Sequence, residues 1–250
     1  MCTWSASERA KKRSAELIPG PSPGKFNQEI SWALVYCQLT GSFEKLDEIL
    51  ARGSTDPKDD PNGLMASLRF GARMLERNYP DAERSAVAAP VTIFDQWSAA
   101  RVTKSFLLGI VAMVQGDTAK AKPWFEAEFQ FAESELNEMP DSANRHAQLG
   151  LVCAYLGRKE EAIAEGRRAV ELLPITKDAF EGPWLLASLA EIYGRVGERN
   201  RAIELLQQLL TLPGGVTVAE LKRDWQWDPL RDDPRFQKIL SQPEPKVIFN

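Results

Sequence analysis

The chain has 250 residues, of which 44% are hydrophobic and 26% are charged, and these shares are ordinary for a globular protein. Its length allows one large domain or two small ones and is sufficient for a sizeable core. The formal net charge of −4 argues against a nucleic-acid partner bound through counterion release. A basic run at residues 9–13 is too short to change this conclusion, and we expect it to form a solvated helix side.

Cysteine usage and apolar runs bear on the compartment. Cys2, Cys37 and Cys153 are widely spaced, so they predict neither a disulfide framework nor a CxxC metal pair, and a reducing compartment fits best. The longest apolar run, at residues 106–114, is far below the ~20 residues that a membrane span needs. The N-terminus has no signal-peptide pattern. We therefore expect a cytoplasmic protein without membrane insertion, unless the chain is a piece of a longer protein whose targeting segment lies elsewhere.

Residues 1–25 predict one helix and a linker. The stretch "SERAKKRSAELIPG" reads like the second helix of a repeat unit whose first helix is missing. The following "GPSPGK" is similar to a phosphate-binding loop, but it has three residues between its glycines instead of four. Phe26 also stands where Ser or Thr should bind magnesium, and two prolines remove N–H donors. We interpret this stretch as a Pro/Gly linker.

Residues 27–213 have helical periodicity and predict about five helical hairpins, three of them clear from about residue 102. In the clearest unit, Gly157 breaks the chain between the amphipathic helices "RHAQLGLVCAYLG" and "KEEAIAEGRRAVELLP". The turn glycine recurs 41 residues earlier as Gly116 and 40 residues later as Gly197. Two earlier units are weaker, and their turn residues are Gly41 and Arg77.

The clearest unit has a Leu-Gly pair in its first helix, a turn glycine, two alanines in its second helix and a closing proline. These residues are Leu149-Gly150, Gly157, Ala162, Ala169 and Pro174. This pattern resembles the tetratricopeptide repeat (TPR) family. The resemblance implies an all-α fold, a right-handed superhelical solenoid of antiparallel helix pairs. Gly and Ala at the helix contacts let two backbones approach where a larger side chain would clash.

Residues 102–240 also resemble the C-terminal repeat region of bacterial multidomain signalling proteins. In those proteins the repeats follow a protein kinase, an adenylate-cyclase-like domain, a TolB-like region or a winged-helix DNA-binding domain. None of these domains is present here. The chain is therefore either a free-standing version or a piece of a longer product, and the incomplete N-terminal unit favours the second.

For residues 214–243 we expect short helices that cap the last hairpin, with residues 244–250 as a tail. Thr217 suits the start of one helix, and the Asp-Pro pairs at 228–229 and 233–234 suit the starts of two more. The end of a repeat array needs a cover with a polar outer face. The side chains expected to form its apolar side are Trp225, Trp227, Leu230 and Phe236.

The sequence contains no recognisable catalytic or metal-binding constellation. His146 is the only histidine, and its position on the first helix of a repeat favours a packing role over that of a general base. No His, Cys or Asp cluster has metal-ligand spacing. We therefore expect a protein that is not an enzyme and that uses no cofactor or metal.

The resemblance to TPR proteins implies a concave groove lined by the first helix of each unit. The groove residues predicted by carrying these positions over are Gln38, Met74, Phe106, Ile110, Met113, Leu151, Tyr155, Trp184 and Arg195. Most are apolar, whereas TPR domains that clamp a chaperone's C-terminal carboxylate use Lys, Arg and Asn there. An amphipathic partner helix, or the protein's own terminal segment, suits such a groove better. Alternatively, these apolar side chains are simply part of the core.

Two functions are compatible with these features. The first is a scaffold or regulatory module, without enzymatic activity, that binds a protein or peptide partner in the groove and acts in bacterial signalling. The second is a ligand or peptide sensor that controls an attached or partner effector. The sequence predicts neither the identity of the partner nor an oligomeric state.

Overall fold

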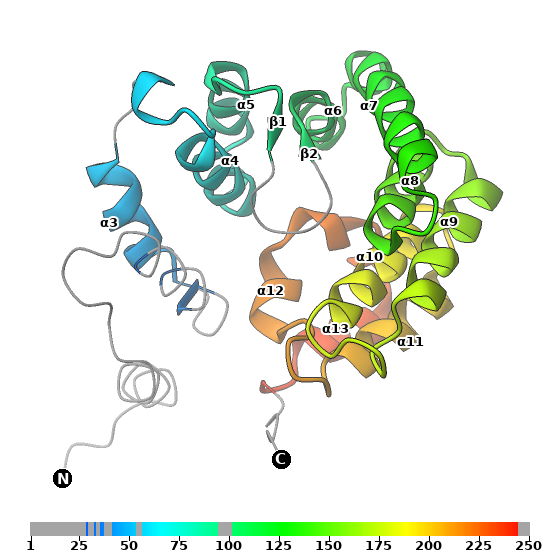
Figure 1. Cartoon of the computed structure of the whole chain (residues 1–250). Coiled ribbons are helices and arrows are strands. Elements are labelled where there is room, and N and C mark those ends of the chain that lie inside the picture. The colour runs from blue at the N-terminus through cyan, green and yellow to red at the C-terminus, as the bar shows by residue number, and fades with distance from the viewer. Residues whose placement is uncertain are drawn as a thin grey trace, which may run out of the picture.

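A computed structural model of the chain describes residues 29, 33, 36–37, 42–53, 57–94 and 102–244, and the described part is mostly helical (Figure 1). Its elements are α3 (Glu44–Arg52), η1 (Pro57–Asp59), α4 (Leu64–Leu75), α5 (Tyr79–Ala88), β1 (Ile93–Phe94), β2 (Val102–Thr103), α6 (Lys104–Val114), α7 (Thr118–Glu138), α8 (Ala143–Tyr155), α9 (Lys159–Leu172), α10 (Gly182–Arg195), α11 (Arg199–Leu209), α12 (Val218–Arg223), η2 (Trp225–Leu230) and α13 (Pro234–Leu240). Within these ranges no helix has both the length and the apolar character that a membrane crossing requires.

Four sequence-based expectations lie outside the described residues. They concern the helix and linker at residues 1–25, the predicted groove residue Gln38, the predicted turn at Gly41 and the tail after Glu244.

Within the described residues four helix pairs pack as hairpins, namely α4 with α5, α6 with α7, α8 with α9 and α10 with α11. The turn of each hairpin contains one residue with a left-handed backbone. These residues and their φ angles are Arg77 (59°), Gly116 (82°), Gly157 (75°) and Gly197 (83°). Each first helix is closed in the same way, since the N–H two residues past the helical cap returns to a carbonyl five positions earlier, as from Arg158 to Cys153 at 2.9 Å. Glycine adopts this backbone without strain, so Arg77 is the exception among the four.

Small residues bring α8 and α9 into backbone contact. A Cβ added to Gly150 would lie 2.9 Å from the backbone nitrogen of Gly166 and 3.1 Å from the carbonyl oxygen of Ala162. The first distance is shorter than real Cβ atoms show, and the second is tighter than most of their contacts, so the backbone would have to shift. Glycine at position 150 therefore lets the two helices approach this closely.

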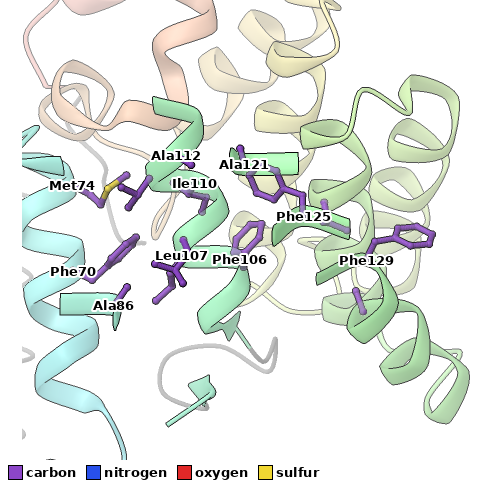
Figure 2. Close-up of a cluster of buried hydrophobic side chains, with 14 of the residues drawn as sticks. Phe70, Met74, Ala86, Phe106, Leu107, Ile110, Ala112, Ala121, Phe125 and Phe129 are labelled. Atoms are coloured by element: carbon purple, nitrogen blue, oxygen red, sulfur yellow. The ribbon is translucent and has the colours of Figure 1, made fainter. Parts of the chain in front are cut away.

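Among the described residues, the largest core cluster runs from α4 to α10 and includes most of α6 (Figure 2). The sequence of α6, "KSFLLGIVAMV", is apolar on every side, as expected for a helix that is covered all round. Figure 2 shows Met74 of α4 on one side of α6 and Phe125 of α7 on the other. A second cluster joins α10 and α11 to the C-terminal segment.

A pair of two-residue antiparallel strands, which the sequence analysis did not expect, precedes α6. Ile93 pairs with Thr103, and Thr103 is also the N-cap of α6 because its Oγ1 accepts a hydrogen bond from the Phe106 N–H. The same hydroxyl donates to the buried carboxylate of Glu128 on α7. Gln148 of α8 donates its Nε2 hydrogen to the other oxygen of Glu128 at 2.7 Å. Thr103 of β2 therefore anchors a polar network inside the core.

The C-terminal segment does more than cover the last hairpin. Figure 1 shows α12 in the opening of the arc that the hairpins describe. The guanidinium of Arg223 lies 5.2 Å from the ring centroid of Phe43, which precedes α3, while η2 packs against α10. This segment therefore spans from one end of the arc to the other.

Two of the three helix starts predicted for the C-terminal segment are confirmed. Thr217 forms a capping box with Glu220, and Asp233 caps α13 with Pro234 in the first turn. The expected helix start at Asp228 is wrong, because Asp228 lies inside η2, whose N-cap is Asp224. The carboxylate of Asp228 is instead engaged by arginines.

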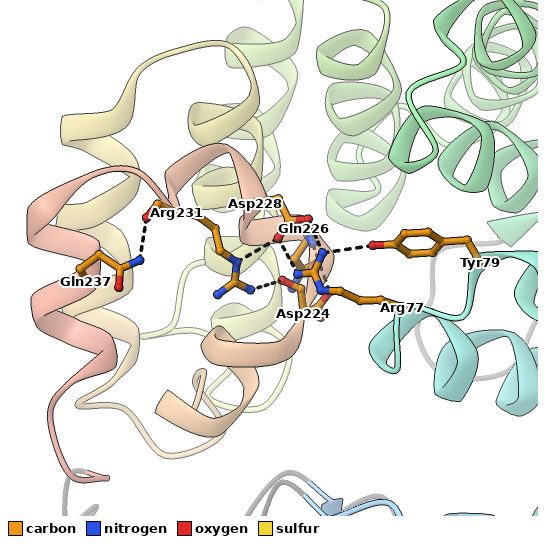
Figure 3. Close-up of polar contacts among 7 residues, drawn as sticks. All are labelled: Arg77, Tyr79, Asp224, Gln226, Asp228, Arg231 and Gln237. Atoms are coloured by element: carbon orange, nitrogen blue, oxygen red, sulfur yellow. Dashed lines mark hydrogen bonds and ion pairs between the residues drawn. The ribbon is translucent and has the colours of Figure 1, made fainter.

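An ion pair joins η2 to the turn between α4 and α5 (Figure 3). Both terminal nitrogens of Arg77 donate to the two oxygens of Asp228 at 2.7 Å, which is the bidentate geometry that arginine and carboxylate favour. Arg231 donates its Nε hydrogen to Asp228 at 2.9 Å and one Nη2 hydrogen to the backbone oxygen of Asp224 at 3.0 Å. The strained turn residue Arg77 thus makes the contact that joins two segments 151 residues apart.

Candidate binding pocket

A pocket of about 420 Å³ lies between the first helices of three hairpins and the C-terminal segment. α6, α8 and α10 contribute to its lining, as do residues 214–216, Glu220, Trp225 and Gln226. Its large apolar and aromatic side chains include Phe106, Ile110, Leu151, Tyr155, Trp184 and Trp225. A cavity of this volume with a mainly apolar lining is in the range of ligand-binding sites.

Most of the predicted groove residues lie at or beside this pocket. Phe106, Ile110, Leu151, Tyr155 and Trp184 line it, and they come from α6, α8 and α10. The Trp184 side chain is 52% exposed, which is unusual for a tryptophan on an inner helix. The pocket thus contains the apolar face that the resemblance implied for these three helices.

Three predicted groove residues do not line the pocket. Met113 and Arg195 lie in contact with each other, with Arg195 Nη1 3.6 Å from the Met113 sulfur. Met74 is 1% exposed and belongs to the core cluster around α6. The expectation for Met74 needs correction, because the next hairpin covers that face of α4 and leaves no groove there.

A tyrosine, a glutamate and an arginine form a polar cluster at the pocket wall. Oε1 of Glu191 accepts hydrogen bonds from the Tyr155 hydroxyl at 2.6 Å and from Arg195 Nε at 2.9 Å. The Tyr155 ring is stacked on Phe125 with centroids 4.7 Å apart. Burial raises the pKa of Tyr155 well above its usual value, so the phenol remains a hydrogen-bond donor at neutral pH.

The guanidinium of Arg195 is also enclosed by aromatic rings. It lies 4.2 Å from the Tyr155 centroid and 5.2 Å from the Trp225 centroid, distances that permit cation–π attraction. Its Nη2 is buried and has no hydrogen-bond partner among the described residues. Arg195 therefore links α8, α10 and η2 behind the pocket.

Two carboxyl groups of the C-terminal segment are held in a desolvated environment near this cluster. Burial is the main cause that raises the pKa of Asp224 to about 7. The charges of Glu220 and Glu191 act in the same direction, and the Gln226 N–H and Arg195 act against it. Burial likewise raises the pKa of Glu220. Of these two groups only Glu220 lines the pocket, while Asp224 lies beside Arg195 and Arg231.

The groups that sequence analysis examined for chemistry are engaged in packing. His146 has Nδ1 2.5 Å from a Glu165 oxygen and Nε2 2.9 Å from the Pro140 oxygen, so both ring nitrogens have partners. Burial raises the pKa of the Cys153 thiol to about 12, so this thiol is not a reactive nucleophile. Among the described residues, no group of three or more His, Cys, Asp or Glu side chains could hold a metal ion.

Sequence reasoning missed the contribution of Trp225 and Glu220 to the pocket. It assigned Trp225 and Trp227 to one apolar face of a cap, but residues two apart in a 3₁₀ helix point in different directions. Trp227 is buried in the cluster that joins α10 and α11 to the C-terminal segment, whereas Trp225 packs against the cluster around α6 and lines the pocket. The spacing of the two tryptophans was the signal that could have separated their roles.

In comparisons with known proteins, no family model and no curated protein matches the chain. The function therefore rests on the pocket and its surroundings.

Proposed function

We propose that the chain is a non-enzymatic binding module of the TPR type, in which the pocket receives a short segment of a partner protein. The observation that carries this proposal is the exposure of two large aromatic side chains on a mainly apolar cavity. Trp184 is 52% exposed and Phe180 is 80% exposed, and both line the pocket. Exposed aromatic side chains beside a cavity are typical of anchoring sites for a partner.

Support for the TPR-type arrangement comes from local features. The left-handed turn residues, the small residues at helix contacts and the packing of successive hairpins fit a right-handed superhelical solenoid. The resemblance of residues 102–240 to bacterial signalling proteins supports a regulatory role for the module.

The dimensions of the pocket favour a short segment over a complete partner helix. Residues 214–216, Glu220, Trp225 and Gln226 line the same pocket as α6, α8 and α10, so part of its wall is supplied by the C-terminal segment. The remaining volume of about 420 Å³ suits a few side chains of an extended peptide.

A selection with a phage-displayed library of random seven-residue peptides on the immobilised full chain tests this proposal. We expect enriched peptides that bind the unaltered chain and lose binding to a Trp184→Ala variant. Trp124→Ala is the matched control, because Trp124 is a 36% exposed tryptophan on α7 that does not line the pocket. The absence of enriched peptides, or equal loss in both variants, would overturn the proposal.

The sensor function is the second candidate, and one observation favours it. Trp225 lines the pocket. Asp228, three residues later in η2, forms an ion pair with Arg77 in the turn between α4 and α5. A ligand that moves Trp225 would therefore also act on the contact between η2 and the α4–α5 turn. Such coupling would let occupancy of the pocket alter the shape of the arc.

A further inference from the structure

The charged side chains that line the pocket are all acidic. They are Glu181 beside α10, Glu191 within α10 and Glu220 of α12, and no Lys, Arg or His of the described residues lines the cavity. The neutral polar groups are side chains such as Asn144 and Gln148. A mainly apolar pocket with several carboxylates and no cation on its walls discriminates strongly by ligand charge.

The carboxylates retain acceptor capacity that the described residues do not use. The side chain of Glu191 is 8% exposed, and both of its protein hydrogen bonds end on Oε1, which leaves Oε2 without a partner among the described residues. Glu220 accepts from the Thr217 N–H through Oε2 alone, and Glu181 accepts from Asn144 through Oε2 at 2.9 Å. These oxygens can therefore accept hydrogen bonds from a ligand that carries donors.

The cation beside Glu191 is Arg195, which does not itself line the pocket. Arg195 gives its Nε hydrogen to Glu191 and lies over the rings of Tyr155 and Trp225. It is the cation that opposes the negative charges around Asp224, where Glu220 and Glu191 act together. A second cation would reduce the repulsion among these carboxylates.

The aromatic walls of the pocket are compatible with an organic cation. The packing of Arg195 on Tyr155 and Trp225 shows that a guanidinium is accommodated against these rings. Trp184 and Phe180 remain exposed and can receive the methylene stem of a basic side chain or its apolar neighbours. A bare metal ion fits less well, since the described residues contain no metal-binding group.

We propose that the pocket selects a peptide segment in which an arginine or lysine is flanked by apolar residues. The charged group lies against Glu191 and Glu220, and its stem and neighbours contact Trp184 and Phe180. This inference rests on the proposed function and adds the charge class of the segment. A carboxylate-bearing or phosphorylated segment is disfavoured by the same three glutamates.

The peptides enriched by the phage selection supply the probes for the test. The strongest binder is synthesised with a fluorescent label, together with a version in which each Arg or Lys is replaced by Gln. Fluorescence anisotropy then gives the dissociation constants of both for the full chain. We expect the Gln version to bind at least about tenfold more weakly, because a charge-assisted contact to a desolvated carboxylate is lost.

A Glu220→Gln variant tests the protein side of the same contact. Gln is accepted at this position of a capping box, so α12 retains its N-terminal hydrogen bonds. Glu133→Gln is the control, since Glu133 is exposed on α7 and does not line the pocket. We expect Glu220→Gln to weaken binding several-fold and Glu133→Gln to leave it unchanged, with circular dichroism confirming that both are folded.

The outcomes separate this inference from the proposed function. Enriched basic and apolar peptides that depend on Trp184 and respond to Glu220→Gln support both. Enriched peptides that depend on Trp184 but are acidic or uncharged, or that bind equally after Arg and Lys are replaced, overturn the charge inference and leave the proposed function standing. Binding that is independent of Trp184 overturns both.

Discussion

Glu128 is a carboxyl group placed completely inside the helical core, and its surroundings explain how it is tolerated. Thr103 and Gln148 donate hydrogen bonds to its two oxygens, yet burial still raises the pKa of Glu128 to about 7. Near neutral pH this group is partly protonated. The network thus links β2, α7 and α8, and it makes the free energy of unfolding depend on pH.

The sign of this dependence follows from the two pKa values. The unfolded chain loses the Glu128 proton near pH 4.5 and the folded chain near pH 7, so the folded state holds more protons between these values. The stabilisation from this proton is present below about pH 4.5 and is lost as the pH rises to about 7. For this shift the loss is about 3 kcal/mol at most.

We therefore predict that Glu128→Gln removes this decrease. Urea unfolding at a series of pH values from 4.5 to 8 would show a flatter profile for the variant, and at pH 8 a higher free energy of unfolding than for the unaltered chain. The exposed Glu133→Gln variant should keep the original profile. An unchanged slope in Glu128→Gln would show that the buried carboxyl does not govern this range.

Some helix glycines lie at a close contact between two helices, and others have free space around them. Gly150 is at a backbone contact, whereas a Cβ added to Gly71, in the interior of α4, would meet nothing within 4 Å. The two positions therefore separate the packing role of glycine from its cost in helix propensity.

Replacing each of these two glycines by alanine should change the free energy of unfolding in opposite directions. Gly71→Ala should raise the free energy of unfolding by about 0.5 to 1 kcal/mol, because alanine is the better helix former. Gly150→Ala should lower it by about 1 to 3 kcal/mol, because the new methyl group displaces the backbone of α9. Chemical denaturation of both variants measures this, and stabilisation by Gly150→Ala would contradict the close contact of α8 and α9.

Much at the scale of elements could be predicted from sequence, because helices and turns depend on neighbouring residues. The left-handed turn at Gly157 and the N-cap at Asp233 follow from residue chemistry within a few positions. Asp228 carried the same Asp-Pro signal as Asp233 but was overridden by the earlier cap at Asp224. The small β1–β2 pair was missed because two residues a strand give no alternation to detect.

At the scale of the whole molecule, the C-terminal segment closes the arc from within. This placement depends on contacts such as Arg77 with Asp228, between residues 151 positions apart, and no local pattern encodes them. For the same reason the sequence could place Phe106 and Trp184 on inner helices but could not show that Glu220 and Trp225 complete their pocket. The prediction that Met74 lines the groove was wrong for a related reason, because tertiary packing buries that side of α4.

Removal of the ion pair between Arg77 and Asp228 should loosen the C-terminal segment locally. Both side chains are partly exposed, so an Asp228→Asn variant should lose no more than about 1 kcal/mol of global stability. Hydrogen–deuterium exchange should nevertheless be faster in α12 and η2 and unchanged in α8 and α9. Equal exchange in all four elements would show that the ion pair does not hold the segment in place.

The central claim is that the pocket beside Trp184 holds a peptide. Its most direct test is the dissociation constant of one selected, labelled peptide for Trp184→Ala and Trp124→Ala, measured side by side by fluorescence anisotropy. We predict at least about tenfold weaker binding for Trp184→Ala and no more than about twofold for Trp124→Ala, as expected for an aromatic anchor and a distant control. Equal affinities for the two variants would contradict the claim.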